Sequence, residues 1–276
     1  MKAFVIKLSL FGVIISVCLY ISGELLYYGI NKYGKNFLNN ADYKVTESII
    51  RSRNHKKVKK LILGDSVSAS LYGESEDSCV YSLSSTVALT TVGNYLLCSN
   101  FFKNNADQLP EEVILILNPL CWTNTMTGGL FYSTFTKNFF NDEFKCFLDK
   151  EEIDYLNEET FTFFCNQRWY QLSPYIPETH QVQESGKYIS PIQYKYLMKL
   201  ERMCNEKHIK FRLLSGPVRQ SLRNDIEEKL KGDTICTTAL FRKYFFSIQY
   251  WDDDNFVDQF HLKKESIPND YFNLYK

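Results

Sequence analysis

Apolar residues along the chain fall into short continuous runs and into longer segments with helical spacing, and the two kinds alternate. A continuous apolar run bounded by turn residues is typical of a strand that is buried on both faces of a parallel sheet. The strand-like runs are 60–63, 79–84, 112–118, 209–218 and 243–251, and the helical segments are 86–102, 190–208 and 221–232. This alternation predicts a layered α/β fold with a mainly parallel sheet.

Residues from about 120 to 190 break the alternation. They are rich in aromatic residues, Asn and Thr, and they show no clean periodicity. We expect this stretch to be an insertion of short helices and loops over the carboxyl edge of the sheet. Open α/β sheets bind their ligands at that edge.

The most apolar stretch lies at the N-terminus, where the segment from Ala3 to Gly23 contains Lys7 as its only charged residue. A helix of this length spans roughly 30 Å, the thickness of the hydrocarbon core of a bilayer. A cleaved signal peptide is the alternative, but no clear A-x-A cleavage site follows, which favours an uncleaved anchor. Such an anchor most often leaves the bulk of the chain outside the cytoplasm, so we expect a periplasmic or extracellular domain.

These patterns divide the chain into three parts. We expect residues 1–28 to form the membrane anchor or signal segment and residues 29–57 to form a polar stalk. Residues 58–276 are then one globular domain that contains the irregular insertion at about 120–190. The 276 residues, of which 45% are hydrophobic, suffice for a sizeable core.

Composition narrows the classes of partner. The 32 basic and 32 acidic residues give no net charge, which removes the electrostatic argument for nucleic-acid binding. The eight cysteines form no C-x-x-C pair, so no zinc ribbon or redox motif is visible, and the disulfide pairing stays open. The acidic run Asp252 to Asp254 lacks the spacing and the glycine of a calcium loop. We therefore expect a solvated turn there and neither a metal nor a cofactor.

The first strand-like run ends abruptly in Gly64, Asp65 and Ser66. These are turn residues, and a turn alone would explain them. The alternative is that the strand delivers Ser66 to the rim of the sheet as a nucleophile, which then needs a base and a carboxylate to orient that base. Of the four histidines only His261 has an acid at a suitable spacing, because Asp258 precedes it by three residues. A D-x-x-H turn lets the carboxylate accept one imidazole N–H while the other ring nitrogen takes a proton from a serine.

The order of these motifs resembles that of the GDSL-type, or SGNH, esterases and acyltransferases, over roughly residues 58–276. The shared features are Gly-Asp-Ser after the first strand, Asn118 at the end of the third strand-like run, and D-x-x-H near the C-terminus. The resemblance implies a three-layer flavodoxin-like fold with a mainly parallel sheet of about five strands. It also implies that Ser66 is the nucleophile, His261 the general base and acid, and Asp258 the orienting carboxylate.

The resemblance further implies three oxyanion-hole donors, and here the chain departs from the family pattern. The first donor is the N–H of Ser66. The second is a backbone N–H at a position where the family has a glycine, and this chain offers Ser84, or Ser85 next to it. The third is an asparagine side chain, for which we expect Asn118, with Asn124 as the substitute. Asn118 as a plain strand cap before a proline stays an open alternative.

The residues that follow Ser66 distinguish between two kinds of hydrolase. The G-x-S-x-G elbow of α/β-hydrolases is absent, because Val67, Ser68 and Ala69 come next. This fits the turn that the resemblance to the SGNH family implies, in which a short helix begins just after the serine. We expect Ser68 and Ser70 to be residues of that helix.

The function that these residues predict is that of a membrane-anchored serine ester hydrolase or O-acyltransferase that works through an acyl-Ser66 intermediate. The expected substrates are acyl groups, commonly acetyl, on cell-surface carbohydrate, and a multi-spanning membrane acyltransferase is a candidate partner. The alternative is a catalytically inactive SGNH-fold protein that binds or assembles components of a polysaccharide-modification system. The altered second and third motifs favour that alternative, whereas an intact Ser66, Asp258 and His261 oppose it.

Overall fold

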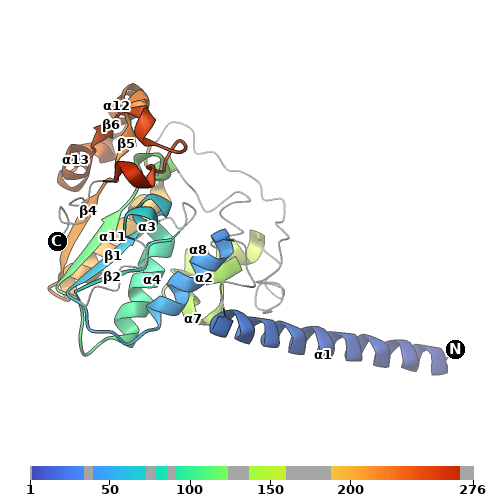
Figure 1. Ribbon diagram of the computed structural model, residues 1–276. Helices are drawn as coiled ribbons and strands as arrows, with labels where there is room; N and C mark the ends of the chain where they lie inside the picture. Colours follow the sequence, from blue (N-terminus) through green and yellow to red (C-terminus); the bar gives the residue numbers. More distant parts are fainter. Residues whose placement is uncertain are drawn as a thin grey trace.

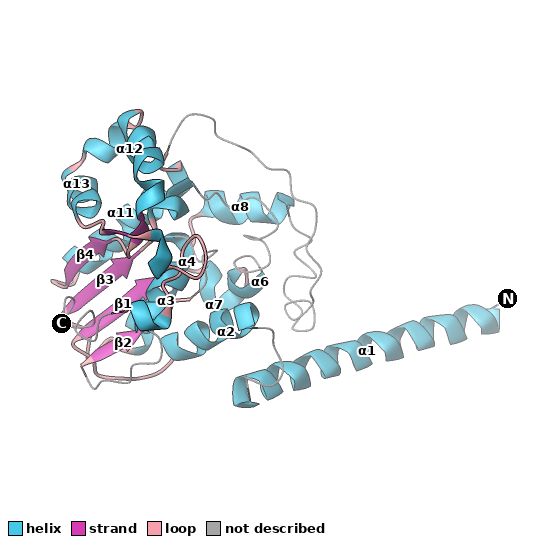
Figure 2. Cartoon of the chain, turned by 45° about the horizontal axis from the view of Figure 1, so that its top comes forward, coloured by secondary structure: helices cyan, strands magenta, loops and turns pink. Residues whose placement is uncertain are grey.

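The computed structural model describes residues 2–33, 40–72, 79–85, 91–123, 137–159 and 188–267. At the centre of the body lies a parallel sheet in the order β2-β1-β3-β4 (Figures 1 and 2). Its strands are β1 (Lys60–Gly64), β2 (Val80–Ser82), β3 (Glu112–Ile116) and β4 (Lys210–Leu214). The predicted α/β fold with a mainly parallel sheet is confirmed, although the main sheet has four strands where about five were expected.

The strands are in register, so their carboxyl ends meet at one edge. Gly64 pairs with Ile116, and Ile116 pairs with Leu214. All five residues of β3 are buried, which agrees with its continuous apolar sequence. Side chains that follow β1 and β3 are thereby brought to the same edge of the sheet.

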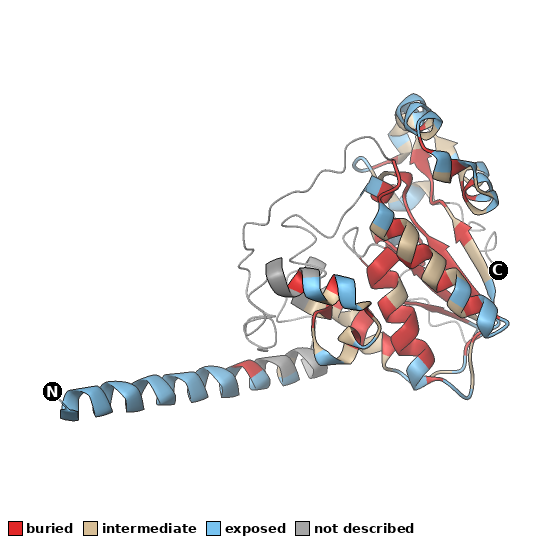
Figure 3. Ribbon diagram, turned by 180° about the vertical axis from the view of Figure 1, so that it is seen from behind, coloured by how far each residue is buried: buried red, intermediate tan, exposed pale blue. Residues whose placement is uncertain are grey.

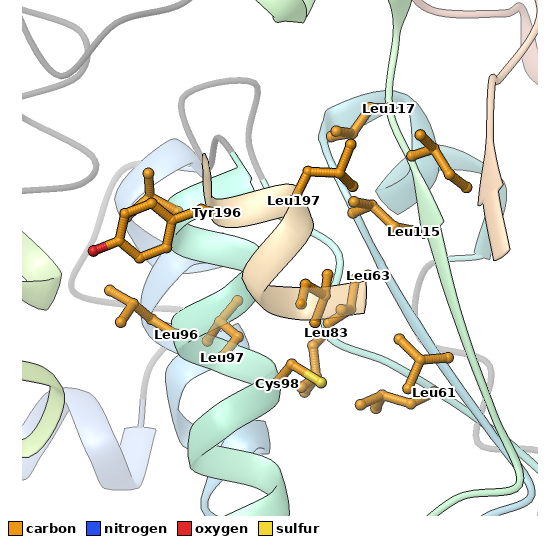
Figure 4. Close-up of a cluster of buried hydrophobic side chains, with 14 of the residues drawn as sticks. Leu61, Leu63, Leu83, Leu96, Leu97, Cys98, Leu115, Leu117, Tyr196 and Leu197 are labelled. Atoms are coloured by element: carbon orange, nitrogen blue, oxygen red, sulfur yellow. The ribbon is translucent and has the colours of Figure 1, made fainter. Parts of the chain in front are cut away.

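Both faces of the sheet are covered by hydrophobic clusters, because successive side chains of a strand point to opposite faces. Leu61 and Leu115 belong to the cluster that also contains residues of α4 (Thr91–Asn104) and α11 (Pro191–Glu206), as Figure 4 shows. Ile62 and Ile114 belong to the second cluster, with residues of α3 (Ser66–Tyr72) and of the C-terminal segment. The sheet therefore lies between two layers.

The globular body begins earlier in the chain than the sequence indicated. Residues 40–52, which were expected to belong to a polar stalk, form the helix α2 (Asn40–Ser52). Val45 and Ile49 on this helix are buried in the main cluster. The Ser52 hydroxyl accepts a hydrogen bond from Asn100 Nδ2 of α4 at 3.0 Å. A mainly polar helix of this kind needs only one narrow apolar face to pack against the body.

Two segments near the C-terminus were predicted as strands that are longer than those in the structure. The run 209–218 is divided into β4 and β5 (Val218–Arg219), because Gly216 and Pro217 separate them. A β-carbon at Gly216 would lie 2.6 Å from Val67 Cγ1, so the backbone approaches α3 closely at this point. The run 243–251 begins with the end of α13 (Ala239–Phe246) and contains only the short strand β6 (Tyr250–Trp251), which pairs with β5.

The remaining described elements are short. Where the structure describes the predicted insertion, at 120–123 and 137–159, the chain forms 3₁₀ and α-helices; residues 124–136 and 160–187 lie outside the described residues. Further short helices connect the strands near the C-terminus. Together these elements are η2 (Pro119–Thr123), α6 (Lys137–Phe139), α7 (Asp142–Lys145), α8 (Lys150–Glu159), η4 (Gln220–Leu222), α12 (Arg223–Lys231), η5 (Thr234–Thr237), η6 (Asp253–Asn255) and η7 (Lys264–Ser266). The long helix α11 begins where Ser190 accepts a hydrogen bond from Gln193 N–H, with Pro191 at its first position.

The N-terminal segment forms one long helix, α1 (Lys2–Tyr33). From Lys2 to Leu25 it is long and apolar enough to cross a membrane, and none of its most apolar window is buried within the protein (Figure 3). A signal sequence near the N-terminus would also meet these criteria of length and apolar composition. The anchor and the side of the membrane on which the body lies stay predictions.

Candidate active site

The candidate site lies where the chain leaves β1 and β3 in opposite directions. From β1 the chain continues to β2, which lies beside β1 toward one edge of the sheet. From β3 it continues to β4, which lies beside β3 toward the opposite edge. Ser66 comes two residues after the end of β1, and Asn118 comes two residues after the end of β3. In open α/β sheets such a switch point, at the carboxyl ends of the strands, is the usual place for a ligand.

Gly64 allows the turn that presents Ser66. Its φ angle is +156°, a region that other L-residues rarely adopt. A β-carbon at this position would lie 2.2 Å from the carbonyl oxygen of Ile116 and 2.5 Å from Ser68 Cβ. The N–H of Gly64 donates to the buried Asn94 Oδ1 at 2.8 Å, so the end of β1 is also held by α4. The expected short helix then begins at Ser66 itself.

The three residues expected to form a triad meet in the structure, although 195 positions of sequence separate Ser66 from His261. His261 Nε2 lies 2.9 Å from Ser66 Oγ. His261 Nδ1 lies 2.8 Å from Asp258 Oδ2 and 3.0 Å from Oδ1. All three distances are those of hydrogen bonds. A turn alone would not explain this contact between Ser66 and a distant imidazole.

The loop that carries Asp258 and His261 is closed at its base. Phe256 and Leu262 form an antiparallel bridge, and both side chains are buried in the second hydrophobic cluster. Above this base, Asp258 Oδ1 accepts hydrogen bonds from the N–H groups of Phe260 and His261, at 2.7 and 2.8 Å. The carboxylate and the imidazole are therefore fixed by the backbone of the same short loop.

The charge of Asp258 determines which ring nitrogen of a neutral His261 imidazole carries the proton. Partial burial alone would raise the pKa of this carboxyl, but the N–H groups of Phe260 and His261 and the imidazole outweigh it and lower the pKa. An ionised carboxylate only accepts hydrogen bonds, so in the neutral imidazole the tautomer with the proton on Nδ1 is favoured. Nε2 then presents its lone pair to the Ser66 hydroxyl, as a general base requires.

Two of the three expected oxyanion donors have no competing hydrogen bond. Within the part of the chain that the structure describes, neither the N–H of Ser66 nor Nδ2 of Asn118 has an acceptor. The Asn118 amide is nevertheless fixed, because its Oδ1 accepts from the N–H of Leu120 at 3.0 Å. Asn118 is buried and follows β3, and its hydrogen bond to Leu120 is also that of a plain strand cap, so its role as a donor stays a prediction. The substitute, Asn124, lies outside the described residues.

The remaining expected donor, the backbone N–H of Ser84 or Ser85, is used in another way. The N–H of Ser84 donates to Ser82 Oγ at 3.2 Å, and the N–H of Ser85 donates to the carbonyl oxygen of Gly64 at 3.2 Å. The Ser84 hydroxyl lies 2.7 Å from the hydroxyl of Ser68 on α3. In this conformation Ser84 therefore fastens the end of β2 to α3, and its N–H is not free for an oxyanion.

Sequence reasoning assigned no role to Asp65, which the structure places in a central position. Its carboxylate is completely buried and accepts hydrogen bonds from three backbone N–H groups and from the Cys121 thiol. Burial raises the pKa of Asp65, and the four donors act in the opposite direction. The Gly-Asp-Ser motif contains the residue, but two of its four partners, Asn118 and Cys121, belong to a distant turn.

No metal centre is found among the described residues, since they contain no suitable group of three or more His, Cys, Asp or Glu side chains. The acidic run predicted to be a turn forms η6, where Asp253 pairs with Arg219 at 3.0 Å. Four buried cysteines have free thiols, namely Cys98, Cys121, Cys204 and Cys236.

Comparisons with protein-family models, with curated proteins and with solved structures give no match to this chain. The chemistry of the site is therefore argued from its own geometry.

Replacing Asn118 with alanine tests the side-chain donor. If Nδ2 holds an oxyanion, we expect kcat for an activated acetyl ester to fall by about a hundredfold or more, with little change in KM. Because Leu120 loses its hydrogen-bond acceptor as well, the unfolding temperature serves as the control for general damage. A loss of activity below about tenfold would exclude Asn118 as the donor.

Proposed function

We propose that this protein is an SGNH-type serine ester hydrolase or O-acyltransferase that works through an acyl-Ser66 intermediate. The observation that carries the proposal is the continuous hydrogen-bonded chain from Ser66 Oγ through the His261 imidazole to Asp258. The sheet order β2-β1-β3-β4 supports it, since it contains the first four strands of the flavodoxin-like order 2-1-3-4-5.

The first half of the reaction forms the acyl-enzyme. Ser66 Oγ attacks the carbonyl carbon of the ester while His261 Nε2 takes the hydroxyl proton. The resulting oxyanion accepts hydrogen bonds from the N–H of Ser66 and from Asn118 Nδ2. When this intermediate collapses, the bond from carbon to the alcohol oxygen breaks, and the imidazolium returns its proton to the leaving alkoxide. Asp258 stabilises the imidazolium in between.

The second half repeats these steps with another nucleophile. His261 removes a proton from water, or from a hydroxyl of an acceptor, and that oxygen attacks the acyl carbon. The tetrahedral intermediate collapses, the bond to Ser66 Oγ breaks, and the serine recovers its proton from the imidazolium. Hydrolysis and transfer therefore use the same residues and differ only in the acceptor.

The proposed substrate is an acetylated cell-surface carbohydrate outside the cytoplasm, where the apolar N-terminal helix would hold the protein at the membrane. The open position of the site supports a large substrate, since the side chain of His261 is 29% exposed and that of Asp258 is 51% exposed. A multi-spanning membrane acyltransferase is the proposed partner for transfer. The family resemblance suggests both the substrate and the partner.

Labelling with a fluorophosphonate tests the proposal directly, because such a probe phosphonylates only an activated serine. We expect the full chain in detergent to be labelled on Ser66 and the Ser66→Ala variant to remain unlabelled. Ser70→Ala is the matched control, because Ser70 is an exposed serine on the same helix whose hydroxyl donates to the carbonyl of Val67. Labelling of Ser66→Ala equal to that of the wild type would refute the assignment.

A second candidate function is an inactive SGNH-fold protein that binds or assembles components of a polysaccharide-modification system. The observation that favours it is the N–H of Ser84, which is bonded to Ser82 rather than available to an oxyanion. Absence of both labelling and esterase activity from the folded wild type would favour this second function.

A further inference from the structure

The buried carboxylate of Asp65 connects the two turns that form the candidate site. Oδ1 accepts from the N–H groups of Val67 and Ser68, at 2.9 and 3.2 Å, and so closes the turn that begins with Ser66. Oδ2 accepts from the N–H of Asn118 at 2.6 Å. One carboxylate therefore holds the backbone of both the nucleophile turn and the donor turn, which follow neighbouring strands.

The Cys121 thiol is the fourth donor to this carboxylate. Its Sγ lies 3.3 Å from Asp65 Oδ2, and the side chain is buried. The N–H of Cys121 also donates to the carbonyl oxygen of Asn118 at 2.9 Å, which closes the turn after β3. Burial and the negative charge of Asp65 raise the pKa of the thiol, so it stays protonated and acts as a donor. The thiol thus belongs to the same unit as Asn118.

We infer that Asp65 and Cys121 are positioning residues that fix the distance between Ser66 and Asn118 and so preform the oxyanion hole. Neither side chain needs to touch the substrate. A buried carboxylate with four donors has a well-defined orientation, and a displacement of about 1 Å at a reacting group can cost on the order of a hundredfold in rate. The part of this inference that concerns turnover rests on the proposed function.

Two substitutions of Cys121 test the thiol as a donor. Both Cys121→Ser and Cys121→Ala remove the sulfur, but only serine keeps a hydrogen-bond donor. We expect kcat of the serine variant to stay within about twofold of the wild type and that of the alanine variant to fall by about tenfold, which corresponds to one hydrogen bond to a charged group. KM should stay unchanged in both. Equal kcat values for the two variants would contradict the inference.

The carboxylate itself is tested with Asp65→Asn. The amide group places an NH₂ where Oδ1 or Oδ2 now accepts hydrogen bonds, so at least one backbone N–H loses its acceptor. We expect kcat to fall by about a hundredfold or more. Hydrogen–deuterium exchange at Asn118, measured by mass spectrometry on the full chain in detergent, should become at least tenfold faster. If this variant does not fold, kcat and hydrogen–deuterium exchange at Asn118 are measured on the two Cys121 variants, and these results decide whether the inference holds.

The exchange measurement separates this inference from the proposed function. If the wild type neither labels nor turns over an ester, but exchange at Asn118 accelerates in Asp65→Asn and in Cys121→Ala and not in Cys121→Ser, the proposed function fails and the positioning role is supported. If the wild type is active and neither exchange nor kcat responds to these substitutions, the positioning role is wrong and the proposed function stands.

Discussion

Replacing His261 with alanine is expected to lower the turnover of an activated acetyl ester by about four orders of magnitude or more. The imidazole is the only group within hydrogen-bonding distance of Ser66 Oγ in the described residues that could take its proton. Without it the hydroxyl stays protonated, and the leaving alkoxide has no acid. Steady-state kinetics with a chromogenic acetyl ester measure the loss.

A matched control is available on the same chain. His55 is an exposed histidine whose Nδ1 bonds to the carbonyl oxygen of Asn104, on a surface that belongs to α4 and the loop before β1. His55→Ala should therefore leave kcat and KM unchanged. If His261→Ala kept more than about a tenth of the wild-type kcat, another base would have to activate Ser66, and the role of His261 would be wrong.

Asp258→Asn is expected to cost somewhat less, about three to four orders of magnitude in kcat. An amide can donate to Nδ1 and so favour the tautomer in which Nε2 carries the proton, and that tautomer cannot accept from Ser66. The lowered pKa of Asp258 keeps the wild-type carboxylate ionised at neutral pH, so the wild type does not suffer this reversal. A kcat within tenfold of the wild type would show that the backbone alone orients His261.

The contact of Ser66, His261 and Asp258 was predictable because each of these residues lies in a short motif. Gly64 and Ser66 follow an apolar strand, and the spacing of Asp258 and His261 fits a single turn. Parallel strands bring their carboxyl ends to one edge, which accounts for the places of Ser66 and Asn118. Asp258 and His261 instead come after β6, which pairs with β5 in a separate sheet. The hydrogen bonds of Ser84 and Asp65 were not predictable, because they depend on the side-chain and backbone directions of distant turns.

The errors in secondary structure have similar causes. The segment predicted as a fifth strand contains the buried Tyr244. The buried Phe241 precedes it by three positions, which is helical spacing, but Phe241 lies before the predicted segment. A run rich in aromatic residues is compatible with a strand or with a buried helix. In α2 the polar composition suggested a solvated stalk, whereas Val45 and Ile49 on one face suffice to pack it against α4.

Gly64→Ala is expected to destabilise the folded protein by about 3 kcal/mol or more. Two independent causes add at this position. The backbone has a positive φ angle of +156°, and the new β-carbon would meet the carbonyl oxygen of Ile116 and the side chain of Ser68 at distances of 2.2–2.7 Å. The atom of Ile116 is part of the central strand β3 and cannot move without disturbing the sheet.

Gly232→Ala is the matched control for this substitution. Gly232 follows α12 with a φ angle of −91°, and nothing lies within 4 Å of the position that its β-carbon would occupy. We expect its free energy of unfolding to change by less than about 1 kcal/mol. Denaturant unfolding of the full chain in detergent measures both variants. A stable Gly64→Ala protein that still labels with the fluorophosphonate would mean that the turn before Ser66 does not require glycine, and that Ser66 can be presented by a different backbone.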